Sequence, residues 1–266
     1  MNANDQAIIN ARGRIENMKK IAFYNRKGGV GKTTCCVNTS YSFALMGKKT
    51  LIIDLDNQNS CSLFLGINKK IYNKRFDNIF TDDNFNLEDA IYQVNDMENL
   101  FIIPCSDLKS VESFLYASSR PDLVFKRRLS ELENMDFDYI FIDCAPSTSK
   151  INDAILLYVE NLVIPVQLQT ASVNAVSDIY EYLNELDISP DVIKLVVPNM
   201  YRKTSDSDVC LAFLKTKFDE SILTEPINLR TKITEATTVG IPAINYDKEA
   251  STEFLKIISK VVERIG

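Results

Sequence analysis

Six short, continuous runs of apolar residues, separated by longer stretches with helical spacing, constrain the fold of this chain more than any other feature. The runs are Ile21–Tyr24, Leu51–Asp54, Leu100–Ile103, Tyr139–Ile142, Leu162–Val166 and Ile193–Val197. Continuous rather than alternating apolar runs are typical of strands covered on both faces. Strands that alternate with helices at this spacing predict an α/β fold, in which helices flank both faces of a mostly parallel, twisted sheet.

Three of the intervening stretches carry clear helical signals. We expect helices at Thr33–Met46, which ends before a glycine, and at Ser172–Leu186 and Ser251–Ile265, where apolar residues recur about every 3.6 positions. In the last of these, the residues expected to face the core are Phe254, Leu255, Ile258, Val261 and Val262.

The domain organisation is expected to be simple. No Gly/Ser-rich or Pro-rich linker and no repeat interrupts the chain, so we expect a short N-terminal extension at 1–19 and one domain at 20–266. The polar first 18 residues lack the apolar core of a signal peptide. No apolar run approaches the roughly 20 residues that span a bilayer. We therefore expect a cytoplasmic protein with no membrane partner.

Composition excludes several kinds of chemistry. The 266 residues include no histidine, which excludes Ser-His-Asp and Cys-His nucleophiles and H-E-x-x-H zinc sites. The net charge of −6 argues against coating nucleic acid through overall charge, although local basic patches are compatible with it. The six cysteines form no C-x-x-C pair and are expected to be small buried packing residues.

A glycine-rich loop follows the first apolar run and precedes the first helix. It reads Lys-Gly-Gly-Val-Gly-Lys-Thr-Thr over 27–34. Glycines let backbone N–H groups approach phosphate oxygens, and a helix N-terminus adds a positive dipole. Lys32 can then reach the β- and γ-phosphates, and the Thr33 hydroxyl can ligate Mg²⁺. The usual phosphate-binding loop has glycine where Arg26 stands, so this loop departs from the standard pattern.

Carboxylates end two of the expected strands. Asp54 and Asp56 are two residues apart, so their side chains point to the same side, and Asp143 ends another strand. The carboxyl ends of parallel strands form the crevice where open α/β sheets bind ligands. One carboxylate near Mg²⁺ and one near the attacking water is what phosphoryl transfer to water needs.

These motifs resemble those of the deviant-Walker P-loop ATPases of the ParA/MinD type, and the likeness extends over most of 20–262. Lys27 matches the signature lysine of that family. Leu51–Gln58 is similar to the family motif D-x-D-P-Q, and Tyr139–Pro146 is similar to its Walker B stretch, which usually ends in D-x-P-P. Asn57 and Ala145 stand where the family has proline, which bears on the turnover rate more than on nucleotide binding.

The resemblance implies Mg²⁺-dependent hydrolysis of ATP and a role for each matching residue. Asp56, Lys27 and Lys32 would be catalytic: Asp56 would orient the water, and Lys27 would reach the nucleotide of a partner subunit in an ATP-dependent homodimer. Thr33, Asp54 and Asp143 would hold or support the metal. The residues implied in nucleotide binding are Lys27, Gly28, Gly29, Val30, Gly31, Lys32, Thr33, Thr34 and Asn199, the last one meeting the adenine.

Within the family, the chain is closest to short ParA/Soj-type partition ATPases. Arg230–Ala236 and Gly240–Pro242 resemble the C-terminal basic loop and helix of that group. Arg202, Lys203, Arg230 and Lys232 are therefore expected to contact double-stranded DNA without sequence specificity. The implied partner is a ParB-like centromere-binding adaptor, the implied cargo a plasmid or chromosome, and the implied location the nucleoid.

Other interpretations stay open. The same ATPase switch could carry another cargo or cycle on a membrane as in MinD, although the C-terminal helix lacks an added basic tail. An iron–sulfur P-loop reductase would need bridging cysteines, for which Cys105 or Cys144 could be proposed. A small-molecule P-loop kinase would transfer phosphate to an acceptor other than water, and Lys27 argues against it.

Overall fold

The computed structural model describes residues 18–95 and 97–266. The expected extension at 1–19 therefore lies outside the described residues except for Met18 and Lys19, and Lys19 already belongs to the first strand.

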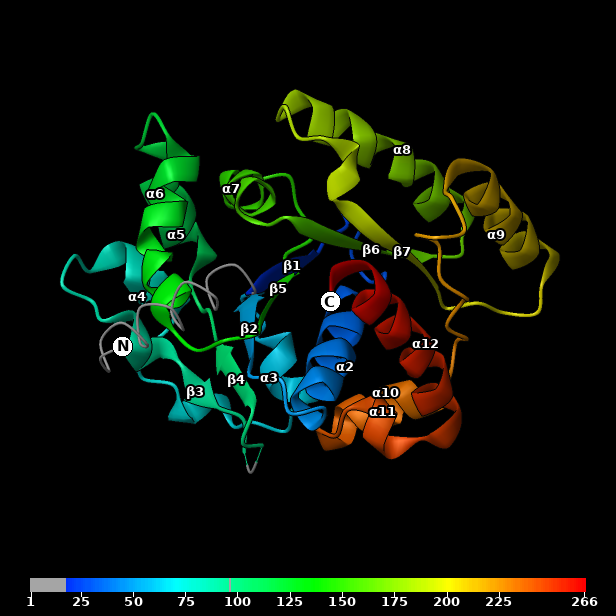
Figure 1. Ribbon diagram of the computed structural model, residues 1–266, viewed down its shortest axis with the longest axis horizontal. Coiled ribbons are helices and arrows are strands. Elements are labelled where there is room, and N and C mark those ends of the chain that lie inside the picture. The colour runs from blue at the N-terminus through cyan, green and yellow to red at the C-terminus, as the bar shows by residue number, and fades with distance from the viewer. Residues whose placement is uncertain (1–17, 96) are drawn as a thin grey trace, which may run out of the picture.

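One sheet lies at the centre of the described chain (Figure 1). Its strands are β1 Lys19–Phe23, β2 Thr50–Leu55, β3 Tyr92–Gln93, β4 Leu100–Ile103, β5 Tyr139–Cys144, β6 Asn161–Gln167 and β7 Ile193–Asn199. Their order is β3-β4-β2-β5-β1-β6-β7, and every pair is parallel except β3 with β4. The predicted mostly parallel α/β sheet is confirmed, and all six apolar runs are strands in it.

The strands are buried on both faces, which explains why their sequences do not alternate. In β1, Ala22 packs in the core on one face, whereas Ile21 and Phe23 pack in the core on the other. Figure 1 shows α4 to α9 covering the first face and α2, α3 and α10 to α12 covering the second. Between the helices and each face of the sheet lies a core of apolar side chains that are almost wholly buried.

Eleven α-helices lie in the described part of the chain. They are α2 Lys32–Leu45, α3 Ser60–Phe64, α4 Phe76–Thr81, α5 Leu108–Tyr116, α6 Pro121–Arg128, α7 Lys150–Tyr158, α8 Thr170–Glu185, α9 Ser205–Lys217, α10 Thr231–Val239, α11 Ala243–Tyr246 and α12 Lys248–Ile265. Four short 3-10 helices are also present: η1 Lys69–Ile71, η2 Leu87–Ala90, η3 Ser130–Asn134 and η4 Pro190–Val192. Within these residues, no helix is long and apolar enough to cross a membrane.

The three expected helices are present with small shifts at their ends. Helix α2 stops at Leu45, and Gly47 then takes the left-handed conformation, φ +78°, that follows many helix ends. Helix α12 begins three residues before the expected start because the Asp247 side chain accepts a hydrogen bond from Ala250 N and caps the helix.

One expectation for α12 is wrong. Leu255 and Val262 do not face the core, since about half of each side chain is exposed. The buried stripe follows Phe254, Ile258 and Val261. A residue one position further along a helix is rotated by about 100°, which carries Leu255 and Val262 past the edge of that stripe.

The connections of β1 and β5 create the crevice of the sheet. These two strands are neighbours, but the chain leaves β1 through α2 on one face and leaves β5 through α7 on the other. The two connections lead to opposite sides of the sheet, so the carboxyl ends of β1 and β5 border an open groove, the usual ligand site in such folds. The glycine-rich loop and Asp143 lie there.

Candidate functional site

The loop between β1 and α2 has a backbone that only glycine fits well. Gly29 and Gly31 have φ of +73° and +96°, in the left-handed region that side chains disfavour. A Cβ on Gly31 would also lie 2.1 Å from the Asn199 amide nitrogen. The loop leads directly into α2, whose first turn has no acidic residue and no side-chain cap. The helix N-terminus is thus left open to an anion.

Lys32, the first residue of α2, is folded back over this loop. Its Nζ donates to the carbonyl oxygens of Asn25 at 3.1 Å and of Lys27 at 3.0 Å. Burial lowers the pKa of this ammonium group, and the nearby Asp143 carboxylate opposes that shift. The Asn25 side chain braces the loop, since it donates to Pro165 O and accepts from Lys27 N. A nearly buried cation therefore lies inside the loop, where an anion would meet it.

Two buried carboxylates lie side by side on adjacent strands. Asp54 on β2 and Asp143 on β5 are register partners, and both are almost completely buried. Burial raises the pKa of both carboxyls, that of Asp143 to about 6, and Asp143 further raises that of Asp54. The Asp143 charge thus disfavours the charged form of Asp54, and a cation bound beside Asp143 would relieve this repulsion.

Asp143 has the free oxygen that a metal site requires. Its Oδ2 accepts from the Thr33 hydroxyl at 2.7 Å and from Cys61 Sγ at 3.4 Å, while its buried Oδ1 has no hydrogen-bond partner among the described residues. The hydroxyl and carboxylate oxygens present are the donors that Mg²⁺ prefers, so these residues fit that ion. Asp54 differs, because its two oxygens accept from the backbone N–H groups of Asp56 and Cys61. Asp54 therefore holds the following loop.

Asp56 lies in the loop that follows β2. Its carboxylate accepts from Gln58 N and from the Ser60 hydroxyl, both at 3.0 Å. The adjacent Asn57, which replaces the proline of the family, accepts from Leu108 N at 2.9 Å and so ties this loop to the first turn of α5. Ser60 of α3 and Leu108 of α5 thus both hold this loop, although it lacks the proline of the family.

These groups meet around one cavity of about 310 Å³. Gly29, Gly31, Lys32, Thr33, Thr34, Asp56 and Asp143 line it. Gly28 does not line it; a Cβ added to Gly28 would lie 3.8 Å from the Pro146 side chain. The Val30 side chain is buried in the protein. Lys27 points elsewhere, because its Nζ donates to the Ser172 hydroxyl on α8 at 2.6 Å.

A second cavity, of about 210 Å³, continues from the first. The two share Thr34, Phe64 and Met200 in their walls. Its other lining comes from Asn199, the segment 228–230 and α10. The Asn199 amide donates to Val30 O at 2.8 Å and its oxygen accepts from Met200 N at 2.8 Å, so this side chain joins the end of β7 to the loop. Together the two cavities form an elongated site with a charged end and a more apolar end.

The four residues expected to contact DNA fall into two groups. Arg202 and Lys203 are exposed after the end of β7. Arg230 forms ion pairs with Glu249 and Glu253, and Lys232 pairs with Glu235 at 2.7 Å. The structure therefore does not bring these cations together as one unpaired patch within one subunit.

The cysteines are all buried and none is in a disulfide, as expected for packing residues. Cys61 was not singled out in the sequence, yet it contacts Asp143. Ser60, Ser172 and Glu253 were also missed. Ser172 and Glu253 act through contacts with segments far away in the sequence, and Ser60 bonds to Asp56 across a loop. No local motif marks such residues.

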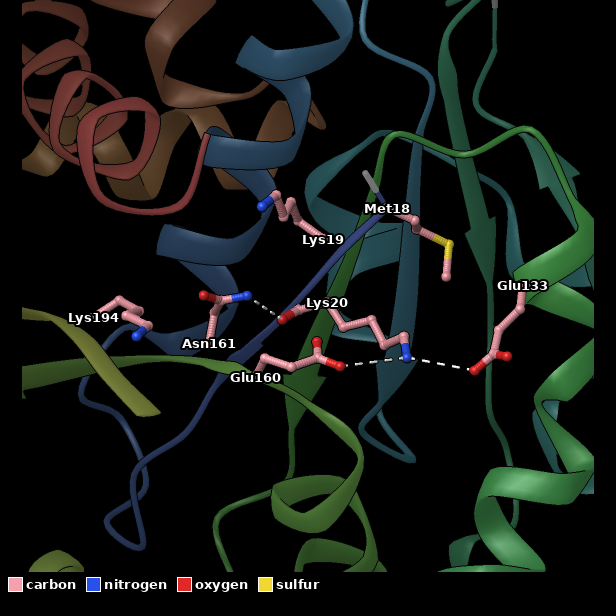
Figure 2. Close-up of a pocket in the computed structure, with 7 residues that line it drawn as sticks. All are labelled: Met18, Lys19, Lys20, Glu133, Glu160, Asn161 and Lys194. Carbon is pink, nitrogen blue, oxygen red and sulfur yellow. Dashed lines mark hydrogen bonds and ion pairs between the residues drawn. The ribbon is translucent and has the colours of Figure 1, made fainter. Parts of the chain in front are cut away.

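Another cavity, of about 410 Å³, lies at the opposite end of the sheet, where β1 and β6 begin (Figure 2). There Lys20 Nζ lies between Glu133 and Glu160, at 3.5 and 3.6 Å. Its ammonium is already paired with carboxylates, and the described residues that line the cavity include no glycine-rich loop and no helix N-terminus. Among the described residues, this end of the sheet therefore lacks the features of a phosphate site.

Comparison with known proteins agrees with the geometry. The AAA domain family matches residues 18–193. The sporulation initiation inhibitor protein Soj of Bacillus subtilis is 30% identical over 237 residues, which cover 86% of this chain and 91% of Soj. The chromosome-partitioning ATPase Soj of Treponema pallidum is 27% identical over 255 residues, which cover 93% of this chain and 98% of that protein.

Among solved structures, an ATP complex of McdA from Cyanothece superposes with a TM-score of 0.81. It is 23% identical, and the match covers 94% of this chain and 98% of McdA, so it shows a shared fold. The family match, the relatives and the glycine-rich loop agree: the chain belongs to the ParA/MinD family of P-loop ATPases with a deviant Walker A motif.

Proposed function

We propose that this protein binds and hydrolyses Mg²⁺-ATP in the elongated site, and that the nucleotide switches it between monomer and dimer. The observation that carries the proposal is the meeting of a glycine loop, the buried Lys32 ammonium and the Thr33–Asp143 pair around one cavity. This is the set of groups that phosphoryl transfer needs for positioning and charge stabilisation.

At the charged end, the loop N–H groups and Lys32 bind the β- and γ-phosphates. The Thr33 hydroxyl and Asp143 hold Mg²⁺, which neutralises phosphate charge when bound. Asp56 orients the attacking water, because it lines the same cavity on a loop fixed by Ser60. Asp54 supports that loop through the backbone of Asp56 and Cys61.

At the other end, the cavity beside Asn199 takes the base. Its lining combines apolar side chains, Phe64, Met200 and Ile233, with polar groups from Thr34 and Asn228. A flat heterocycle with polar edges suits such a lining. Asn199 positions this end through the loop carbonyl of Val30 and through Met200 N.

Lys27 acts between subunits. In one subunit its ammonium is bound to Ser172 and does not line the phosphate cavity. A second lysine next to Lys32 adds like-charge repulsion unless a second set of phosphates lies near it. We therefore assign Lys27 to the nucleotide of the partner subunit in an ATP-dependent homodimer.

The switch serves partition of a plasmid or chromosome with a ParB-like adaptor, on the nucleoid in the cytoplasm. The similarity to a chromosome-partitioning ATPase along 93% of the chain supports this role. Arg202 and Lys203 are exposed and would occur twice in the dimer, where they meet phosphates of any duplex sequence.

Another cargo, moved by the same ATP switch, is the second candidate. The ion pairs of Arg230 and Lys232 favour it, because they reduce the positive charge offered to DNA. The two candidate functions are distinguished by measuring duplex DNA binding by the protein loaded with a non-hydrolysable ATP analogue. Binding near 50 mM salt that disappears with ADP supports partition, and no binding there favours the other cargo.

Phosphate release from Mg²⁺-ATP tests the enzymatic part. Lys32→Ala should abolish ATP binding and turnover, whereas Lys19→Ala, at the opposite end of β1, should leave both unchanged. Because the chain has no tryptophan, binding is followed by calorimetry or with a labelled ATP. Wild-type affinity for ATP in Lys32→Ala would show that the site is wrongly assigned.

A further inference from the structure

One carboxylate, that of Glu253 on α12, collects four hydrogen bonds from the segment 228–230. It accepts from Asn228 N at 3.0 Å, from Asn228 Nδ2 at 2.5 Å, and from Arg230 Nε and Nη2 at 3.2 and 2.6 Å. Its side chain is only 12% exposed. Hydrogen bonds to a charged carboxylate are stronger than neutral ones. Four of them, in a partly buried place, fix the conformation of the segment 228–230.

The segment held by Glu253 is a wall of the base cavity. Asn228, Leu229 and Arg230 all line that cavity, whereas Glu253 does not. On its other edge, the chain at 227–229 pairs with Tyr201, two residues past the end of β7. Tyr201 N donates to Ile227 O and Leu229 N donates to Tyr201 O, each at 2.9 Å. The wall is therefore fixed between the sheet and α12.

Of the two carboxylates that pair with Arg230, Glu253 holds the wall more firmly than Glu249 does. Arg230 also pairs with Glu249, but that side chain is 73% exposed and accepts no hydrogen bond from the wall backbone. Exposed ion pairs contribute little to stability. Loss of Glu253 would instead leave Asn228 N and two of the three hydrogen bonds of the Arg230 guanidinium without their acceptor.

We propose that Glu253 is a positioning residue that orders the wall formed by 228–230 and thereby sets the affinity for the base of the nucleotide. The proposal rests on the function proposed for the elongated site. It also gives Arg230 a role at the nucleotide, because three hydrogen bonds from its guanidinium to α12 hold it in the wall. Lys32 and the loop N–H groups, which bind phosphates, are not touched by Glu253.

The test compares two ligands that share phosphates but differ in the base. Mg²⁺-ATP and Mg²⁺-tripolyphosphate are titrated by calorimetry into wild type, Glu253→Ala, Glu253→Gln and the matched control Glu249→Ala. Glu253→Ala should weaken ATP binding by about tenfold, since the nucleotide must then order the wall itself. Its affinity for tripolyphosphate should stay within about twofold of wild type. Tripolyphosphate has no base and does not contact the wall, so its binding does not include the free-energy cost of ordering the wall.

The conservative variant separates positioning from folding. Glu253→Gln keeps an acceptor for Asn228 N but loses the charge facing Arg230, so its ATP affinity should lie between those of wild type and Glu253→Ala. Glu249→Ala should bind both ligands as wild type does. Thermal unfolding of each variant without ligand is the control for stability.

The possible outcomes are distinct. Unchanged ATP affinity in both Glu253 variants overturns the role of Glu253 and leaves the proposed function intact. Equal losses for ATP and tripolyphosphate also overturn it, because Glu253 would then act on the fold or on the phosphate end. A wild type that binds neither ligand refutes the nucleotide site itself, and the role of Glu253 falls with it.

Discussion

Replacing Ser172 by alanine should make the ATP-loaded dimer tighter. In the structure the Ser172 hydroxyl is buried and accepts a hydrogen bond of 2.6 Å from Lys27 Nζ. If Lys27 has to reach the nucleotide of the partner subunit, this contact must break first. It therefore stabilises the monomer, and its removal shifts the equilibrium towards the dimer.

The size of the effect follows from the exposure of Lys27. A hydrogen bond to a charged group contributes about 1.5–3 kcal/mol when it is shielded from water. Lys27 is half-buried, so water competes, and about 0.5–1 kcal/mol is the better value for each subunit. Two such contacts break per dimer, which gives roughly 1–2 kcal/mol, or about a 5- to 30-fold lower dissociation constant.

Sedimentation over a range of protein concentrations, with a non-hydrolysable ATP analogue, measures this constant. Ser177→Ala is the matched control, because Ser177 lies on the same helix but is exposed. Its dimer should dissociate as that of wild type does. A Ser172→Ala dimer that is equally stable or weaker would refute the reasoning, since the contact would then not oppose dimerisation.

Four further predictions use other parts of the site. Lys27→Gln should keep ATP binding by calorimetry but lose the dimer in sedimentation; an unchanged dimer would contradict its role between subunits. Asp56→Ala should bind ATP and release phosphate at least about 100-fold more slowly, as expected for loss of a group that orients the water, and unimpaired turnover would contradict that role. Gly31→Ala should lower the urea midpoint and ATP affinity more than Gly29→Ala, because only Gly31 also meets the Asn199 side chain; equal effects would argue against that contact. Replacing both Arg202 and Lys203 by alanine removes four cations per dimer and should lower the salt slope of duplex binding by about 3 to 4, whereas an unchanged slope would mean that they do not contact DNA.

The features that were predictable from the sequence are those encoded by neighbouring residues. The runs of apolar residues identified six strands because both faces of those strands are covered, and the glycines of 28–31 identified the loop because few other residues fit its backbone. Strand β3 was missed, since two residues at the edge of a sheet carry no periodic signal. Leu255 was misplaced because one position on a helix decides between core and solvent.

The contacts that complete the site could not be predicted in the same way. Lys27 and Ser172 are 145 residues apart, and only the folded sheet brings α8 next to the loop. From the sequence alone, Arg230 was expected to be available to contact DNA, but α12 places Glu249 and Glu253 against it. Such pairings depend on how helices pack, which local patterns do not specify.

The mass of the protein in solution with each nucleotide tests the central claim most directly. One chain has a mass of 30.2 kDa. With Mg²⁺ and a non-hydrolysable ATP analogue, the account predicts a dimer of twice that mass, and with Mg²⁺-ADP it predicts a monomer. The same mass with both nucleotides, at concentrations where calorimetry shows both to be bound, would contradict it.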